Sequence, residues 1–392
     1  MRYLLRRDTI FATAAVFLFI GLISILPINT SLLNPIKIAL ADFDYSDISY
    51  AELHKNAGKP IDKNIVIVNI GEANRAELAM MIEKINAEGP KVIGLDATFN
   101  GPKEPAQDEL LRSAISHANN LVTASVLHWE DKENPEKLGY FAETVKHRGY
   151  VNFIGEDRGT IRLFSPFEKI GADTAFAFPT VLVKAYNPER YATLLKRHHP
   201  TEIINYNRKE NQYFVIEGQD LLNGETASTV FNNKIVLMGY VNPDENYIED
   251  KHFTPFNERF VGKSTPDMNG VLIHANIISM VLENNYIHKI PSWLNWLITI
   301  LIAWVNVAFF VKYFLDSHIW FHLAAKIVQL ISFIFFVYLS ILFYSKFSIS
   351  FDVKIASYAI IFAVDIIYFY EAFAVWLHQK HNIKTIFHKP HH

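Results

Sequence analysis

The chain has 392 residues, a formal net charge of −3 and no cysteine. The absence of cysteine excludes disulfides, cysteine-ligated zinc and thiol chemistry, and the charge balance excludes the global basic field that attracts nucleic acid. Half of the residues are hydrophobic. They concentrate in an N-terminal run and in the part after Pro291, which predicts membrane segments at both ends of a water-soluble part.

The first predicted element is a membrane span. An apolar run from Thr9 to Ile28 follows three arginines among the first seven residues, and it is long enough to cross a bilayer. A cleaved signal peptide is the competing interpretation, but the run is long for one and no small-x-small cleavage site follows it. We therefore assign residues 1–30 to an uncleaved signal anchor whose basic end stays in the cytoplasm.

Residues 31–290 contain no apolar run of spanning length and predict one α/β domain. Compact apolar strands alternate here with segments of helical periodicity. In chain order these are the strand 65–70, the helix 74–89, the strand 91–99, the helix 105–120 and the strand 121–129. Such alternation implies a mainly parallel sheet with crossover helices.

The second half of this domain is less regular. Its expected elements are two strands joined by a turn at 157–159, a helix over 173–187, a strand pair formed by 202–207 and 212–218, and a core strand at 234–239. A long polar loop then leads to an amphipathic helix that begins at Gly270 and ends near Asn285. Because this helix delivers the chain to the next membrane segment, strand, loop, helix and membrane are connected in series.

Residues 291–378 predict three further spans, near 293–311, 324–344 and 354–377, followed by a short tail over 379–392. The loop after the first of these spans and the tail are both basic, as the cytoplasmic segments of membrane proteins are. We therefore expect four spans with both termini in the cytoplasm. No glycine follows Gly270, so the spans are expected to associate through alanine, serine and polar side chains.

Residues 30–290 contain a series of segments in a recognisable order. They are VIGLDATF with Asp108-Glu109-Leu110-Leu111 after it, YVNFIGEDRGTIR, INYN followed by QDLLNG, KIVLMG followed by Asp250 and FTP, and MNGVLIHANIISMVLENNYIHKIP. In order and spacing this part resembles the type-two CHASE domain, an extracytoplasmic sensory domain of bacterial receptors. The flanking layout, with one span before the domain and three after it, is similar to that of the family.

The resemblance implies a sensory protein of the bacterial inner membrane, with residues 31–290 extracytoplasmic. Family members usually carry a cytoplasmic cyclase, kinase or phosphodiesterase domain after the third span, whereas about 15 residues follow Leu377 here, too few for a fold. We therefore expect a separate membrane or cytoplasmic protein to carry the output. The chain also lacks a glycine-rich phosphate loop, a nucleophile elbow and a paired-carboxylate motif, so we expect neither an enzyme nor a cofactor.

Two residues of the domain are candidates for ligand binding near strand ends. Asp96 ends a buried-type strand at the carboxyl edge, where ligands often bind in open parallel sheets. It is either a ligand-binding carboxylate or a cap that stabilises the next turn or helix. Arg162 follows the turn at Gly159 and either binds an anionic ligand or pairs with Asp157 across the hairpin, the latter being the more ordinary arrangement.

The junction between the polar loop and the helix carries the other candidates. Asp250, His252 and His274 are a possible metal or anion site, but zinc needs three or four convergent ligands, and we predict no metal. His274 and Asn276 are instead expected to hydrogen-bond the loop backbone and pin it to the helix. Thr254, in the Phe-Thr-Pro turn, completes this set of candidate ligand- or partner-binding residues.

The last span contains two ionisable residues. Asp365 lies close to its middle, where a charge costs about 3 kcal/mol on insertion scales and marks function by default. It is either a protonated structural residue bonded to Asn306, Gln329 or a tyrosine, or an ion relay or docking point for a partner. Glu371 is expected to pair with a lysine, Lys326 or Lys312, at the inner surface.

Two functions follow as hypotheses. The first is a non-enzymatic sensor whose exported domain binds a small ligand or partner in the periplasm and passes the change to the spans. The second is a structural or accessory subunit of a larger envelope complex that docks through the exported domain and the spans. In both cases the partners are the lipid bilayer and another protein, and neither involves nucleic acid.

Overall fold

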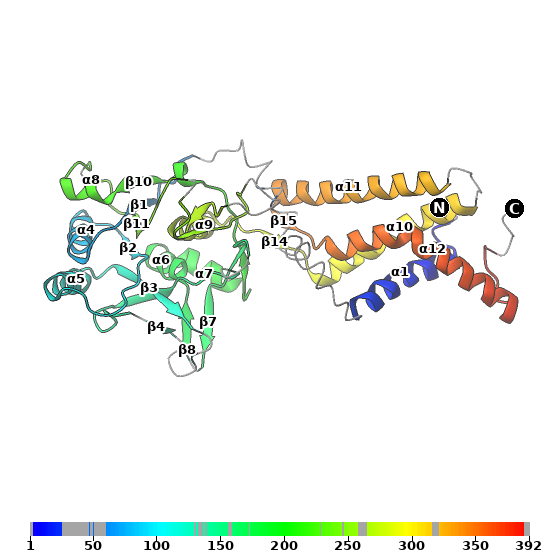
Figure 1. Cartoon of the computed structure of the whole chain (residues 1–392), viewed down its shortest axis with the longest axis horizontal. Helices are drawn as coiled ribbons and strands as arrows, with labels where there is room; N and C mark the ends of the chain where they lie inside the picture. The colour runs from blue at the N-terminus through cyan, green and yellow to red at the C-terminus, as the bar shows by residue number, and fades with distance from the viewer. Residues whose placement is uncertain are drawn as a thin grey trace. The chain divides into compact units, whose positions relative to one another are not determined.

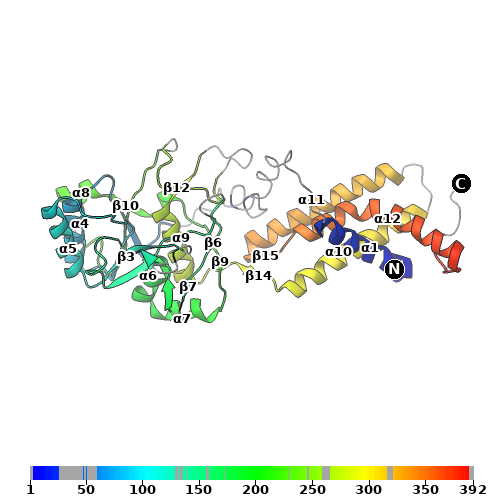
Figure 2. The same cartoon turned by 60° about the horizontal axis from the view of Figure 1, so that its bottom comes forward.

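The computed structural model describes residues 3–25, 47, 50, 60–128, 131, 136–137, 139–155, 159–171, 173–227, 229–244, 247–257, 265–315 and 321–387. The chain divides into two compact units, residues 39–287 and residues 1–38 together with 288–392. Figures 1 and 2 show the elements of both units, and each unit is described by itself. The turn predicted at 157–159 lies largely outside the described residues, because 156–158 are not among them.

Residues 39–287 are built on a parallel sheet, as the sequence predicts. Its strands lie in the order β10-β1-β11-β2-β3, with β5 parallel to β3 and the short β4 antiparallel to the end of β3. The strands are β1 (Ile65–Asn69), β2 (Val92–Leu95), β3 (Leu121–Leu127), β4 (Glu136–Lys137), β5 (His147–Tyr150), β10 (Phe214–Glu217) and β11 (Ile235–Gly239). The central strands are buried on both faces, which explains why they read as unbroken apolar runs rather than as alternating ones.

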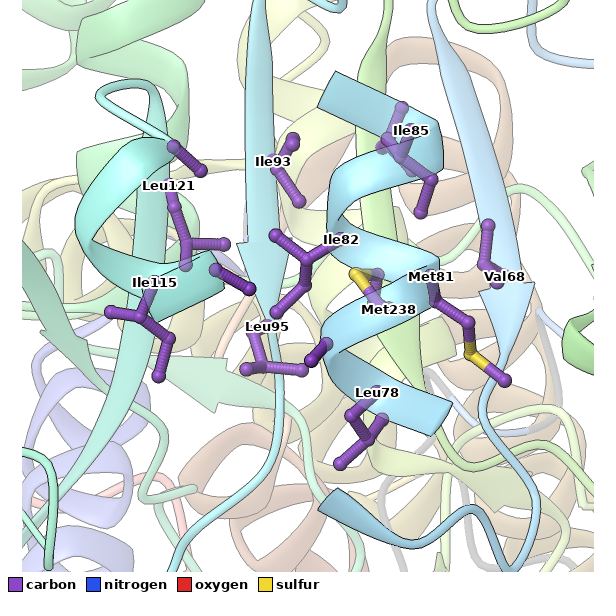
Figure 3. Packing of buried hydrophobic residues seen from close by; sticks show 14 of the residues in the cluster. Val68, Leu78, Met81, Ile82, Ile85, Ile93, Leu95, Ile115, Leu121 and Met238 are labelled. Atoms are coloured by element: carbon purple, nitrogen blue, oxygen red, sulfur yellow. The ribbon is translucent and has the colours of Figure 1, made fainter. Parts of the chain in front are cut away.

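Helices cover both faces of this sheet. One face carries α4 (Arg75–Ala87), α5 (Pro105–His117) and α8 (Gly218–Asn223), whose apolar side chains form one core with alternate residues of the strands. Figure 3 shows this packing, with Met81 and Ile82 of α4 lying over Ile93 and Met238 of the sheet. Asn74 starts α4 with a capping box.

The opposite face carries α6 (Phe178–Tyr186) and α9 (Gly270–Glu283), with α7 (Pro188–Lys196) packed against both. The sequence predicts α9 as amphipathic, and this is wrong: every residue from Gly270 to Val281 is buried. The reason is that α9 lies on the sheet and is covered by α6, α7 and β13, so it has no solvent face.

The remaining strands correct other expectations. They are β6 (Leu163–Phe164), β7 (Phe167–Ile170), β8 (Asp173–Phe176), β9 (Glu202–Ile203), β12 (Lys251–His252) and β13 (Met268–Asn269), with the 3-10 turn η3 (Glu210–Gln212) before β10. The predicted pair of 202–207 with 212–218 does not form, because β9 pairs with β6 and β10 joins the edge of the main sheet beside β1. The helix expected over 173–187 is β8 followed by α6.

The other unit consists of α1 (Arg7–Ile25), α10 (Ser292–Leu315), α11 (Phe321–Phe347) and α12 (Lys354–His381), with β14 (His288–Lys289) paired to β15 (Ile349–Ser350). All four helices are long and apolar enough to cross a membrane. Ala12, Ala303, Ala359 and Ala363 are fully buried where α1, α10 and α12 meet. The expected close contact through alanines is therefore confirmed.

Candidate functional site

The carboxyl ends of β2 and β11 and the start of α9 bring several polar side chains together. Asp96 follows β2 directly, and its backbone N–H donates to the Met238 carbonyl at 2.8 Å. At the end of β11, a Cβ on Gly239 would lie 2.7 Å from the Val271 side chain. This glycine therefore lets the first turn of α9 approach the sheet edge, where ligands bind in folds of this kind.

His274 lies one turn into α9 and faces Asp96, with 3.9 Å between His274 Nε2 and Asp96 Oδ2. The ring of Phe153 stacks on His274 at 4.7 Å and meets the ring of His252 edge-on at 5.2 Å. Asp250 joins the group through its backbone carbonyl, which accepts from Gly270 N–H at 3.2 Å. We define Asp96, Phe153, Asp250, His252 and His274 as the sheet-edge cluster.

Sequence reasoning predicted Asp250, His252 and His274 at one junction but treated Asp96 separately, and the fold joins all four. Phe153 was missed as a site residue. Its only signal was its place in the YVNF segment after β5, where an apolar side chain reads as core.

Burial controls the charges in the sheet-edge cluster. Burial, assisted by the nearby Asp250 carboxylate, raises the pKa of Asp96 from 3.8 to about 7. Burial lowers the pKa of His274 to about 3 and also lowers the pKa of His252. At neutral pH both histidines are therefore uncharged, while Asp96 exchanges its proton near physiological pH.

One buried nitrogen of the cluster, His274 Nδ1, lacks a hydrogen-bond partner among the described residues. The His274 residue as a whole is 2% exposed. The expectation that His274 pins the loop backbone is therefore wrong for the described part of the chain, since His274 stacks on Phe153 and faces Asp96. A buried polar atom without a partner costs about 1–3 kcal/mol and calls for an explanation such as a ligand.

The described residues contain no group of three or more His, Asp or Glu side chains arranged to hold a metal ion. The sheet-edge cluster combines two carboxylates, two imidazoles and one aromatic ring.

The other candidates of the domain lie in structural contacts. Arg162 pairs with Asp47, its Nε and Nη2 donating to the two carboxylate oxygens at 2.9 and 2.6 Å. Asp157, the partner that the sequence favoured, is outside the described residues. Asp47, the observed partner of Arg162, lies 115 positions earlier in the chain. Thr254 N–H donates to Asp267 Oδ1 at 2.8 Å and its hydroxyl to Oδ2, which closes the turn.

Asn276 is buried and pins a backbone segment to α9, although not the loop that was expected. Its Oδ1 accepts from the N–H groups of Asn207 and Arg208, both at 3.2 Å, and its Nδ2 donates to the Arg208 carbonyl at 3.0 Å. The same Nδ2 donates to Leu272 O within the helix. Asn276 thus holds the segment that follows β9.

Asp365 of α12 has a partner that the sequence did not predict. Lys326 on α11 donates to both carboxylate oxygens of Asp365, at 3.0 and 3.1 Å. Gln329 donates to the Ile360 carbonyl at 2.9 Å, and Asn306 donates to Ile302 O of its own helix at 2.9 Å. These bonds to backbone carbonyls give the N–H groups of the two amides partners in apolar surroundings.

A family model described as the CHASE2 domain matches residues 18–311, more than half of the chain. Comparison with curated proteins and with solved structures gives no match.

Proposed function

Because the chain belongs to the CHASE2 domain family, a family of sensory domains, we propose that it is a membrane sensor that acts by binding and not by catalysis. Residues 31–290 lie outside the bacterial inner membrane, and both termini lie in the cytoplasm. The domain binds a small ligand at the sheet-edge cluster, and a separate membrane or cytoplasmic protein carries the output.

The observation that carries this proposal is the buried His274 Nδ1 without a partner among the described residues, beside Asp96 with its raised pKa. Strongly shifted pKa values cluster at functional sites, and a buried polar atom without a partner calls for an explanation such as a ligand. Two carboxylates, Asp96 and Asp250, disfavour each other's charge here. A ligand that donates hydrogen bonds or carries positive charge relieves this repulsion.

The route from the site to the membrane part is short in the chain. His274 is on α9, and only residues 284–291 separate the end of α9 from α10. A ligand at the sheet-edge cluster therefore contacts the helix that continues toward the spans. Sensing requires two conformations that differ in ligand affinity, so a change in the position of α9 is the expected response.

The test is a thermal-shift screen of the full chain in mild detergent at pH 8 with small amines, amino acids and polyols. Gly270→Ala is the key variant, because it places a methyl group inside the sheet-edge cluster and so takes space from a ligand. The methyl would lie 3.6 Å from Phe153 and 3.7 Å from His252 Nε2, at ordinary contact distance, so the fold can accept it. We expect a compound that raises the Tm of the wild type and of the exposed control Asp173→Asn but not of Gly270→Ala or Asp96→Asn. If every stabilising compound acts equally on all four proteins, the cluster is not the ligand site.

A second candidate function, an accessory subunit of a membrane complex, has a specific observation in its favour. The Lys326 and Asp365 side chains are 54% and 49% exposed on the surface of the helical unit, within α11 and α12. Charges that face lipid are costly, so this pair favours a protein partner that covers it. The same contact would serve a sensor that hands its signal to a separate protein.

A mild-detergent pull-down from native membranes, with mass spectrometry of the recovered proteins, separates these functions. A partner in fixed ratio that is lost in Asp365→Leu supports docking at this pair. Gln329→Leu, which removes a polar group whose bonds are internal to the unit, is the matched control. If recovery is the same with Asp365→Asn, Asp365→Leu and the wild type, the ion pair does not contact a partner.

A further inference from the structure

A groove of about 840 Å³ runs between α1 and α12 in the helical unit. Residues from both helices and from the segment 383–385 line it. The groove is separate from the Lys326–Asp365 pair, and neither the ligand site nor the docking contact proposed above uses it. Its two ends differ sharply in chemistry.

Most of the groove wall is apolar and exposed. Leu18 and Leu22 of α1 are 67% and 56% exposed, and Phe369 of α12 is 70% exposed. Ala14 and Ala15 leave room between the larger side chains. From Arg7 to Leu22 the wall follows α1 over 15 helical steps, about 22 Å at 1.5 Å per residue. One leaflet takes about half of the roughly 30 Å hydrocarbon core. The wall is longer than this, so an acyl chain can contact it along the whole length of the chain.

The other end of the groove is polar and positively charged. Arg7 and Lys384 line it, and Arg7 donates one of its N–H groups to the Lys384 carbonyl. A guanidinium carries five such donors in a fixed fork that matches phosphate oxygens. The lysine side chain is exposed, so both cations are placed at the mouth.

Among the described residues that line the groove, Asp8 is the one carboxylate, and it is already bonded within the protein. Asp8 is 5% exposed, and it accepts from Tyr370 OH at 3.0 Å, Thr385 Oγ1 at 2.9 Å and Ile386 N–H at 3.2 Å. These bonds hold residues 385–386 against the start of α1 and thereby place Lys384 beside Arg7. The Asp8 carboxylate is turned to these donors, which leaves the mouth cationic in character.

We propose that this groove binds one phospholipid with an anionic headgroup. The phosphate binds at Arg7 and Lys384, and an acyl chain lies along Leu18, Leu22 and Phe369. Two cations at one end and an apolar wall at the other match the two parts of an anionic amphiphile, its phosphate and its acyl chain. The proposal rests on the membrane placement of the helices but not on ligand binding by the domain.

The test uses the purified full chain in detergent and native mass spectrometry with added phosphatidylglycerol, phosphatidylcholine or inorganic phosphate. We expect one phosphatidylglycerol to be retained at least ten-fold more strongly than phosphatidylcholine. The double variant Arg7→Gln/Lys384→Gln should lose this preference, and Ala14→Leu, which fills the groove from the apolar side, should lose bound lipid while both cations remain. The control is Lys346→Gln, which removes a cation in the last turn of α11, outside the groove, and it should behave as the wild type.

Three results would overturn the proposal. Equal retention of both lipids by all variants means ordinary lipid contact without a site. Competition by inorganic phosphate alone means an anion site without an acyl chain. Unchanged phosphatidylglycerol retention in both Ala14→Leu and the double variant places the lipid elsewhere. Because Ala14→Leu leaves Arg7, Asp8 and Lys384 intact, loss of folding in the charge variant does not remove the test.

Discussion

Replacing Asp96 by asparagine should stabilise the α/β domain at pH 8 and leave it little changed near pH 4. Asparagine keeps the shape of the side chain and removes its charge. In the wild type, Asp96 is partly buried, near Asp250 and 3.9 Å from a neutral histidine. Ionisation of Asp96 therefore lowers the free energy of unfolding of the wild type, and the uncharged asparagine avoids this loss.

The magnitude follows from the pKa of Asp96, which rises from 3.8 to about 7 on folding. Between these values the folded state binds more protons than the unfolded state, so stability is lost as pH rises through the folded pKa. A shift of about 3 units corresponds to about 4 kcal/mol at 1.36 kcal/mol per unit. This is an upper limit, because the Asp96 side chain is 16% exposed and water screens part of the effect.

His274 acts in the opposite direction. Its pKa falls from 6.5 to about 3 on folding, so it contributes stability above pH 6.5 that is lost as pH falls toward 3. The two contributions largely cancel in the wild type between pH 4 and 6.5. The variant retains only the His274 contribution in this range, so its stability should rise with pH where that of the wild type is nearly flat.

The assay is hydrogen–deuterium exchange of the full chain in detergent from pH 5 to pH 8, read on peptides from β2 and β11. The difference in opening free energy between Asp96→Asn and the wild type should grow by up to about 1.4 kcal/mol per pH unit up to pH 7. Asp173→Asn, at an exposed position on β8, should show no such growth. A difference that stays constant with pH, or a variant that opens more easily at pH 8, would refute the reasoning.

Three further substitutions test the packing around the site by thermal unfolding of the full chain. Gly149→Ala should destabilise by about 3 kcal/mol or more, because its Cβ would lie 2.5 Å from the Phe178 Cα, a backbone atom that cannot yield; a Tm unchanged from the wild type would contradict this contact. Asn276→Leu should cost about 2–4 kcal/mol by leaving buried backbone groups unpaired, and a cost below 1 kcal/mol would mean that water replaces the amide. Arg162→Met should cost about 1–3 kcal/mol, since it leaves the Asp47 carboxylate without its bidentate partner, and an equal loss in Asp47→Asn/Arg162→Met would show that the pair itself contributes little.

Much of the fold could be predicted because the sheet is buried on both faces. IVIVN and IVLMG form β1 and β11 at the expected positions, since a continuous apolar run of this length has few other structures. The four long apolar helices could also be predicted, because an apolar run of about 20 residues is long enough to cross a bilayer. The amphipathic interpretation of α9 failed because its asparagine, serine and histidine side chains resemble a polar face. All three lie inside the protein, where Asn276 and Ser279 are hydrogen-bonded.

The pairing of charged residues could not be predicted, because it depends on which segments the fold brings together. Arg162 finds Asp47, and Lys326 finds Asp365 on a neighbouring helix, where sequence reasoning chose nearby or same-depth partners. Likewise, Asp96 and His274 are far apart in the chain, and only the close approach permitted at Gly239 places α9 over the edge of β2 and β11.

The sheet-edge cluster and the structural residues of the domain differ in one physical respect. Arg162, Thr254 and Asn276 have their bonding groups satisfied by protein partners, which is how buried polar groups stabilise a fold. Asp96 is partly buried and His274 is buried, both have shifted pKa values, and His274 Nδ1 is unpaired among the described residues, which lowers stability. A ligand that binds only the folded state raises the free energy of unfolding. Binding at Asp96 and His274 would therefore compensate for the stability that these two residues cost the free protein. The same substitution, Asp96→Asn, should therefore raise stability without ligand and abolish the further stabilisation by ligand, and these opposite effects distinguish a binding residue from a structural one.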